Sequence, residues 1–360
     1  MFIFLIVLLL LLMIIYVFFR VHSLSFIKKI NNKFINIFIT LIPFVILFVF
    51  GYIDLINTFS VFIHLFLILI IFDFIFFILR KISKKNLNYS ISFIMAFCFT
   101  FVYMGYGYYL AHHVVETKYI IDATKNIGVD NFRIVQVTDS HIGATMNGDE
   151  FIAYMEKINK TNPDIVVVTG DFVDDDTLEE DMIKACRGLG NLKTKYGVYF
   201  VYGNHDKGYF TYRTYDDTFL RKELKKNNVI ILEDESINIL DNIILVGRQD
   251  TQVSTRETAW NLTKDLDKSK YIITLDHEPN DYENEANADM DLVISGHTHG
   301  GQFFPLGPIG VKFGSNDSYY GLQKRKNTTF IVSSGIGDWA IKFKTGTISE
   351  YVIIDITNKK

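Results

Sequence analysis

The stretch from Leu292 to Gln302 reads LVISGHTHGGQ, an apolar run that passes directly into glycines and two histidines. Its first four residues predict a buried strand, because they are apolar or small and carry no charge. The glycines then allow the backbone to turn and to approach a site closely. His297 and His299 are therefore expected at the carboxyl end of a strand, the edge where open α/β sheets bind ligands.

Four more polar motifs follow apolar runs in the same way. They are Asp139-Ser140-His141 after Phe132–Thr138, Gly170-Asp171 after Ile165–Thr169, Gly203-Asn204-His205-Asp206 after Val198–Tyr202, and Asp276-His277 after Tyr271–Leu275. All five histidines of residues 120–360 lie in these five motifs. Since ligands bind where the strands of an α/β sheet end, we expect the motifs to converge. Carboxylates and imidazoles together favour a hydrolase site with two divalent cations.

The charge balance divides the chain near residue 119. Nine of the 36 Lys and Arg and three of the 40 Asp and Glu precede residue 120, which leaves 27 basic and 37 acidic residues in the remainder. An acidic catalytic region argues against a nucleic-acid partner, which requires a basic face. The two cysteines, Cys98 and Cys186, lie in regions of different character, so a structural disulfide is not expected.

The first third of the chain is predicted to lie in a membrane. Its apolar stretches approach the roughly 20 residues that a helix needs to cross a bilayer. They are Phe2–Phe19, Phe34–Ile53, Phe59–Leu79 and Ile91–Leu110. The sequence thus predicts a transmembrane region of about four helices over residues 1–111, a tether of mixed charge over 112–131 and a catalytic domain over 132–360.

Basic residues are concentrated in two of the connecting loops. Arg20–Lys33 and Arg80–Lys85 each carry four Lys or Arg, and the positive-inside rule places such loops in the cytoplasm. With four spans, the catalytic domain of this multi-pass membrane protein is expected outside the cytoplasm. Asp73 and His64 are ionisable groups within the third stretch, for which a functional role and a hydrogen bond to a neighbouring helix both stay open.

The five motifs, in this order and at these spacings, resemble those of the calcineurin-like metallophosphoesterases, particularly the membrane-anchored bacterial branch with the signature GHTHGGQ. The resemblance covers about Phe132 to Ile356. It implies an α/β fold, a four-layer α/β/β/α sandwich with a dinuclear metal centre at the strand ends. Ser140 departs from this branch, where the position is commonly apolar, and its side chain is expected to point away from the metals.

Carried over residue by residue, the resemblance implies seven metal ligands. One metal would be held by Asp139, His141 and His299, the other by Asn204, His277 and His297, and Asp171 would bridge both. Such ligands suit Mn, Fe or Zn. The implied reaction is hydrolysis of a phosphoester by attack of a hydroxide bound to both metals.

Residues beside the ligands have competing interpretations. The resemblance implies that His205 stabilises the phosphoryl group and protonates the leaving oxygen, and Asp206 would either orient that imidazole or cap a turn. Arg248 follows a strand and could bind substrate phosphate, with a surface salt bridge as the alternative. Of the acidic run 174–176, only Asp174 is expected near the ligands. Trp339 is expected near the site, lining the cleft or touching membrane.

The membrane location favours a phosphodiester, monoester or pyrophosphate of a lipid or cell-envelope metabolite as substrate. Two other functions stay open: a non-catalytic metal-binding sensor or scaffold in the membrane, and a transporter whose apolar helices carry the main function. The intact ligand set argues against the first, and only Asp73 and His64 support the second.

Overall fold

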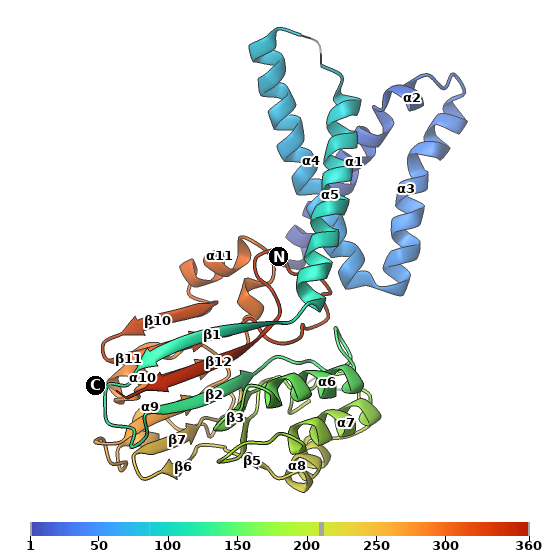
Figure 1. Ribbon diagram of the computed structural model, residues 1–360. Helices are drawn as coiled ribbons and strands as arrows, with labels where there is room; N and C mark the ends of the chain where they lie inside the picture. The colour runs from blue at the N-terminus through green and yellow to red at the C-terminus, as the bar shows by residue number, and fades with distance from the viewer. Residues whose placement is uncertain (1, 86, 209–211, 359–360) are drawn as a thin grey trace. The chain divides into compact units, whose positions relative to one another are not determined.

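The computed structural model describes residues 2–85, 87–208 and 212–358. The chain divides into two compact units, Met1–Gly107 and Tyr108–Lys360, which we call the helical unit and the sheet unit. Long helices make up the first, and the twelve described strands belong to the second (Figure 1).

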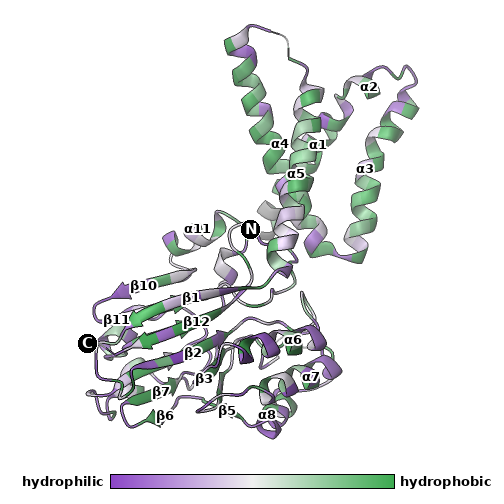
Figure 2. Ribbon diagram, in the orientation of Figure 1, coloured by the Kyte–Doolittle hydropathy of each residue, from purple (hydrophilic) through white to green (hydrophobic). Residues whose placement is uncertain are grey.

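The helical unit is built from apolar helices, which Figure 2 colours as predominantly hydrophobic, and all but one, of four residues, are long. They are α1 (Phe2–His22), α2 (Ser25–Lys28), α3 (Lys33–Ile53), α4 (Leu55–Ser83) and α5 (Tyr89–His112), the last of which ends in the sheet unit. By length and composition α3, α4 and α5 could each cross a membrane, and α1 contributes a shorter apolar stretch, Val7–His22. The described chain thus holds three candidate spans where the sequence predicted about four.

Asp73 of α4 joins three helices within this unit. Its carboxylate lies 2.6 and 2.7 Å from the guanidinium nitrogens of Arg20 and accepts hydrogen bonds from the hydroxyls of Tyr16 (2.6 Å) and Ser92 (2.7 Å). A charge inside an apolar bundle is stable only when it is paired in this way. His64 has a local contact instead, with Nδ1 2.7 Å from the Ser60 carbonyl oxygen.

The sheet unit contains two six-stranded sheets. The strand orders are β1-β12-β2-β3-β4-β5 and β10-β11-β9-β8-β7-β6. The strands are β1 (Val115–Asp122), β2 (Asn131–Val137), β3 (Ile165–Thr169), β4 (Val198–Val201), β5 (Val229–Ile231), β6 (Glu235–Leu240), β7 (Ile243–Gly247), β8 (Tyr271–Leu275), β9 (Leu292–Ser295), β10 (Gly321–Arg325), β11 (Thr328–Val332) and β12 (Glu350–Thr357). Neighbours from β2 to β5 pair in parallel, as do β7, β8, β9 and β11.

Three apolar cores separate four layers. Because successive side chains of a strand point to opposite faces, Val135 of β2 packs toward the helices while Ile134 packs toward the second sheet. The first sheet is covered by α6 (Gly148–Asn159), α7 (Glu179–Gly190) and α8 (Asp217–Lys226), and the second by α9 (Ala259–Thr263) and α10 (Tyr282–Asn287). The predicted four-layer α/β/β/α sandwich is confirmed.

The segment expected to be a tether, residues 112–131, is more than a linker. Its residues 115–122 form β1, which pairs in parallel with β12 at the edge of the first sheet. The side chains of Thr117, Tyr119 and Ile121 alternate with more exposed ones, and Ile121 enters the core between the sheets. The mixed charge that suggested a linker is the exposed face of an edge strand, where Lys118 lies 2.9 Å from Asp355.

Candidate metal centre

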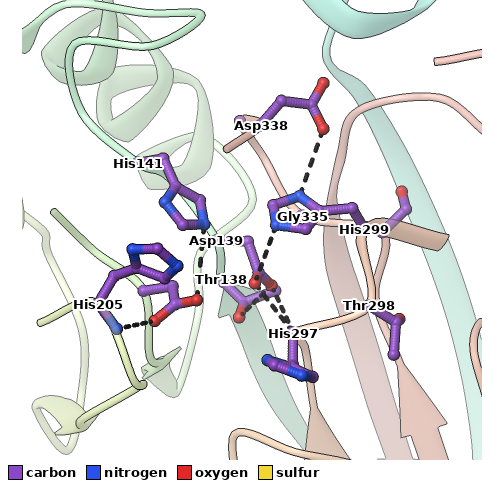
Figure 3. Close-up of polar contacts among 12 residues, drawn as sticks. Thr138, Asp139, His141, His205, His297, Thr298, His299, Gly335 and Asp338 are labelled. Atoms are coloured by element: carbon purple, nitrogen blue, oxygen red, sulfur yellow. Dashed lines mark hydrogen bonds and ion pairs between the residues drawn. The ribbon is translucent and has the colours of Figure 1, made fainter. Parts of the chain in front are cut away.

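The polar motifs meet where five parallel strands end. Asp139 and His141 follow β2, Asp171 follows β3, Asn204 and His205 follow β4, His277 follows β8, and His297 and His299 follow β9. Figure 3 shows Asp139, His141, His205, His297 and His299 grouped around one common space. The convergence that the sequence led us to expect is present in the fold.

The backbone is left-handed at five of these residues. The angle φ is 50° at Asp139, 37° at His141, 50° at Asp171, 70° at His297 and 48° at His299. Residues other than glycine rarely adopt this conformation, and holding one there costs about 1–3 kcal/mol. Such a concentration at one sheet edge indicates that the fold gives up stability to direct side chains into the site.

Two positions require glycine because a carboxylate lies against the backbone there. A Cβ at Gly203 would overlap the Asp171 carboxylate, and a Cβ at Gly296 would overlap the Asp139 carboxylate and the Thr138 hydroxyl. Any larger residue at these positions would push a carboxylate out of the centre. The glycines of the motifs therefore make room for acidic side chains as well as for turns.

Among the described residues, three groups of donor atoms are close enough to hold a cation; one of them, His141, Asp174 and His205, includes no predicted ligand except His141. The other two consist of predicted ligands only. Asp139, His141 and His299 form one group, and Asp171, His277 and His297 form the other, with the donor atoms of each within 4.8 Å of one another. The backbone N–H of His297 donates to both Asp139 oxygens, at 2.9 and 3.0 Å, which fixes that carboxylate.

Asp171 lies between the two groups. Its Oδ2 is 3.6 Å from His141 Nε2 and 3.1 Å from His277 Nε2, so one carboxylate oxygen faces a histidine of each group. Its Oδ1 accepts a hydrogen bond from the backbone N–H of His205 at 2.9 Å. The amide oxygen of Asn204 is buried and has no hydrogen-bond partner among the described residues. A buried oxygen without a partner is costly, and a cation would satisfy it.

The second ring nitrogen of three histidines is held from behind. His277 Nδ1 lies 2.8 Å from the Thr169 carbonyl oxygen, His141 Nδ1 lies 3.4 Å from Asp174 Oδ2, and His299 Nδ1 lies 3.3 Å from Asp338 Oδ1. The His277 contact is a hydrogen bond, which fixes the tautomer and directs Nε2 toward a metal. The His141 and His299 contacts are within ion-pair distance and place a carboxylate behind each ring. The residues present therefore fit two divalent cations in donor type and in orientation.

Burial and neighbouring charge set the protonation of the ligands. Burial lowers the pKa of His299 to about 3, which leaves this imidazole neutral and able to bind a metal. Burial alone would raise the pKa of the Asp171 carboxyl, but the imidazoles of His277 and His141 hold it well below its usual range. For His277, burial is outweighed by Asp171, which raises the pKa of the imidazole well above its usual value. A metal binding there must therefore displace a proton.

The imidazole of His205 is oriented by Asp174 and Asp175. Its Nδ1 lies 3.1 Å from Asp174 Oδ1 and 3.3 Å from Asp175 Oδ2. Burial would lower the pKa of His205, but Asp174 and the nearby Asp171 raise it to about 9, so the ring carries a proton at neutral pH. Asp174 also contacts His141, and we expect it to orient both rings.

Asp206 does not orient His205. Its Oδ1 accepts hydrogen bonds from the backbone N–H groups of Phe172 (2.8 Å) and Val173 (3.1 Å), and its Oδ2 accepts one from Gly203 (2.9 Å). These bonds tie the turn after β3 to the turn after β4. The structure thus corrects the catalytic interpretation of Asp206 in favour of the capping alternative.

Arg248 lies behind the centre rather than in it. Its Nη1 is 2.9 Å from Asp276 Oδ2 and 3.0 Å from Glu285 Oε1, and its Nη2 is 2.9 Å from Asp281 Oδ2. Three carboxylates surround this guanidinium and only 2% of the residue is exposed, so it stabilises the fold and is not available to bind substrate. The alternative, a surface salt bridge, was also wrong in place, because the cluster is buried.

Sequence reasoning missed a buried pair next to His299. The Lys344 ammonium is fully buried, lies 3.2 Å from Asp338 Oδ1 and donates to the carbonyl oxygen of Ser334 at 2.7 Å. Burial raises the pKa of the Asp338 carboxyl to about 7 although Lys344 opposes this shift. Neither residue belongs to one of the five polar motifs. The one signal in the sequence is that Asp338 directly follows a short segment with glycines at 335 and 337.

Comparisons with known proteins agree with this geometry. Residues 132–301 match the family model of the calcineurin-like phosphoesterases. An uncharacterized metallophosphoesterase of Campylobacter jejuni is 29% identical over 307 residues, which cover 82% of this chain and 79% of that protein. A transmembrane protein with metallophosphoesterase domain from Bos taurus is 29% identical, over 62% of this chain and 52% of that protein. This chain thus spans about half the length of the bovine relative.

A dimetal phosphatase from Danio rerio aligns with 59% of this chain and 88% of its own, at 10% identity and a TM-score of 0.36. The family model identifies residues 132–301 as a calcineurin-like phosphoesterase domain, a family of hydrolases that act on phosphoesters, and both relatives are named for a metallophosphoesterase. The assignment to the membrane-anchored bacterial branch stays a prediction.

Proposed function

We propose that this protein hydrolyses a phosphoester with two divalent cations. Asp139, His141 and His299 would hold one cation, Asn204, His277 and His297 the other, and Asp171 both. The observation that carries the proposal is the position of Asp171 Oδ2, within 3.6 Å of a histidine of each donor group. Mn, Fe and Zn all suit these ligands.

The charge of the ligand set favours an anionic substrate. Two ligand carboxylates, Asp139 and Asp171, would face two divalent cations, which leaves excess positive charge in the centre. Asn204 contributes to this balance because its amide oxygen is neutral. A phosphodiester, a phosphomonoester and a pyrophosphate all meet this requirement.

The chain's own residues would supply the proton for the leaving oxygen and hold the side chain that donates it. When bound, the cations would contribute Lewis acidity and make a water molecule more acidic. His205 would donate a proton to the leaving oxygen, since it is protonated at neutral pH and its ring is fixed by Asp174 and Asp175. Asp206 would keep the turns that carry Asp171 and Asn204 in register.

We further propose that the sheet unit lies outside the cytoplasm of a multi-pass membrane protein. Ser25 donates to the Ser90 hydroxyl at 2.9 Å and Asn88 donates to Ser25 at 3.0 Å, so the two basic loops lie at the same end of the helical unit. If α1 crosses together with α3, α4 and α5, the positive-inside rule puts this end in the cytoplasm. Labelling of a Leu178→Cys variant by a membrane-impermeant maleimide on intact cells tests this orientation, and labelling only after lysis would contradict it.

The test of the activity uses the full chain in detergent, with Mn added. Hydrolysis of bis-p-nitrophenyl phosphate and p-nitrophenyl phosphate would be measured for the wild type, Asp171→Asn and His205→Ala. Asp176→Asn is the matched control, because this carboxylate lies in the same acidic run but is exposed. We expect turnover that is lost in the first two variants and retained in the control. A folded wild type that binds two Mn ions without turning over either ester would overturn the proposal in favour of a metal-binding sensor.

A further inference from the structure

An exposed apolar segment follows the last two candidate ligands directly. Residues 303–313 read FFPLGPIGVKF and contain one charged residue, Lys312. They include the helix α11 (Leu306–Lys312). Phe304, Leu306, Ile309 and Phe313 are exposed by 67%, 54%, 42% and 79%, and we call these four side chains the apolar patch.

The apolar patch is unlike the rest of the sheet unit's surface. Other large apolar side chains that the structure describes as exposed there occur singly, such as Leu178 and Trp260, or in pairs, such as Tyr320 with Leu322. Isolated exposed apolar residues are ordinary, whereas several in one short segment mark a surface that contacts something apolar. A short helix that is apolar on nearly all sides also has no stable place in water.

One loop connects the apolar patch to the end of α5. Gln302 donates to the Phe343 carbonyl oxygen at 2.6 Å, and the backbone N–H of Thr345 donates to the Gln302 carbonyl oxygen at 3.0 Å. Further along the same loop, Ser349 donates to the carbonyl oxygens of Leu110 (3.0 Å) and Ala111 (2.8 Å). These residues all belong to the sheet unit, so its own bonds link the patch, through this loop, to the last turn of an apolar helix.

The same loop reaches the candidate metal centre. Trp339 lies at its start, 43% exposed, with its ring centre 5.7 Å from that of His205. At the other side, only the turn from Gly300 to Phe303 separates His299 from the apolar patch. The patch is therefore joined to the centre by a short turn, and the loop bonded to that turn carries Trp339 beside His205.

We propose that the apolar patch inserts into the lipid bilayer at the level of the headgroups and that the substrate is a phosphoester carried by a membrane lipid. The bilayer is the occupant because α5 is a candidate span whose last turn is bonded to the loop that holds the patch. Phenylalanine and leucine with a lysine at the border are the side chains that interfacial helices use. The identity of the substrate rests on the proposed function, whereas the insertion does not.

Such an arrangement solves a geometric problem for the reaction. The phosphate of a lipid sits at the membrane surface while its acyl chains stay in the hydrocarbon layer. With the patch in the interface, a headgroup would reach the centre without extraction of the lipid, and the cost of exposing acyl chains to water would be avoided. Trp339 lies where it would contact the glycerol or upper acyl region of such a lipid.

Nitroxide accessibility tests the insertion without reference to catalysis. An Ile309→Cys variant of the full chain, with Cys98→Ser and with the buried Cys186 retained, would be spin-labelled in bilayer discs of phosphatidylcholine and phosphatidylglycerol. Leu178→Cys, 68% exposed in the same unit, is the matched control. We expect the label at 309 to collide with oxygen more than with a water-soluble nickel complex, and the label at 178 to show the reverse. Water-like collisions at 309 would overturn the insertion, as would shielding from both reagents, which would mean that protein covers the patch.

Two chromogenic diesters with one reacting centre test the substrate class. Hexadecyl p-nitrophenyl phosphate and methyl p-nitrophenyl phosphate would be compared in the same discs. We expect the wild type to prefer the hexadecyl ester in kcat/KM by about tenfold or more, a ratio that corresponds to a modest part of an alkyl chain's burial. The triple variant Leu306→Gln, Ile309→Gln, Phe313→Ser should lose this preference, and the control pair Leu178→Gln, Trp260→Gln should keep it.

The outcomes separate the two proposals. A wild type that hydrolyses both esters equally would overturn the lipid substrate and leave the phosphoesterase standing. A wild type that hydrolyses p-nitrophenyl phosphate but neither diester would overturn the lipid diester and leave the phosphoesterase standing. A wild type that hydrolyses none of the three would overturn the phosphoesterase and the lipid substrate together, and the nitroxide experiment would still decide whether the patch inserts.

Discussion

Two buried clusters of charge lie in the sheet unit, and they balance their acids differently. Around Arg248, the carboxylates of Asp276, Asp281 and Glu285 are neutralised by a guanidinium. Around Asp171, by contrast, the partners are imidazoles, whose charge depends on pH, and a buried Asn204 oxygen has no hydrogen-bond partner among the described residues. A cluster with a permanent cation has a fixed charge balance, whereas the balance of a cluster of acids and imidazoles changes with pH, and its unpaired amide oxygen can bind a metal ion.

The difference between the two clusters is tested most directly by substituting one residue in each of them. Asp171→Asn should lower kcat/KM for bis-p-nitrophenyl phosphate by about four orders of magnitude, because the shared ligand of both cations is lost. The melting temperature of the metal-free protein should change little. If Asp171→Asn instead retained activity with two metals bound, the assignment of the centre would be wrong.

Arg248→Met, in the other cluster, should lower the stability of the fold. Removal of the guanidinium leaves the buried Glu285 and the half-buried Asp281 without this cation, and Asp276 with Arg256 alone. We expect the free energy of unfolding to fall by about 3–5 kcal/mol. Denaturant unfolding of the variant and the wild type measures this loss. Arg325→Met, which removes a more exposed pair with Asp317, is the control and should cost about 1 kcal/mol or less. An equal loss in both variants would show that burial does not decide the energy.

Metal removal should separate the clusters thermodynamically. Metal ions that bind the folded chain alone stabilise it by about 2.7 kcal/mol at a hundredfold excess over Kd. We expect Mn to raise the melting temperature of the wild type and of Arg248→Met, and to raise that of His277→Ala by less, because Asp139, His141 and His299 would still hold one cation. Calorimetry with and without a chelator measures the shift, and an equal rise in His277→Ala would place the bound Mn elsewhere.

Asp338→Asn should have a smaller effect, confined to metal binding. The carboxylate behind His299 orients the ring, and loss of such a partner lowers metal affinity by about 10- to 100-fold. Isothermal titration with Mn measures the affinity of each site. Asp267→Asn, at an exposed carboxylate of the same unit, is the control. Equal affinities in Asp338→Asn and the wild type would show that Asp338 does not support metal binding.

The smallest expected effect is a displacement of the pH profile. His205 is protonated below its pKa of about 9, so activity that needs its proton should be lost as pH rises through that value. Bound cations would lower the pKa in every variant alike. Because the Asp174 carboxylate accepts a hydrogen bond from the His205 ring and raises the pKa of that imidazole, Asp174→Asn should move the alkaline limb to lower pH by about one unit. A limb at the same pH in both proteins would exclude His205 as the acid.

Parts of the fold and site that depend on local pattern were predictable. The runs 132–138, 165–169, 198–202, 271–275 and 292–295 coincide closely with β2, β3, β4, β8 and β9, since a buried parallel strand needs a short continuous apolar run. Strand β1 was missed because an edge strand with one charged face has the composition of a linker.

The sequence alone determined which residues carry the chemistry: carboxylates, imidazoles and one amide at strand ends. The type of each ligand and the apolar run of each strand can both be read from residues that are neighbours in the sequence. Only the tertiary structure decided which charge pairs with which. It placed Asp174 rather than Asp206 on His205, hid Lys344 and Asp338 behind His299, and enclosed Arg248 among three carboxylates. Pairing of buried charges depends on which side chains from distant strands come within a few ångströms of one another, and the sequence order does not record that distance.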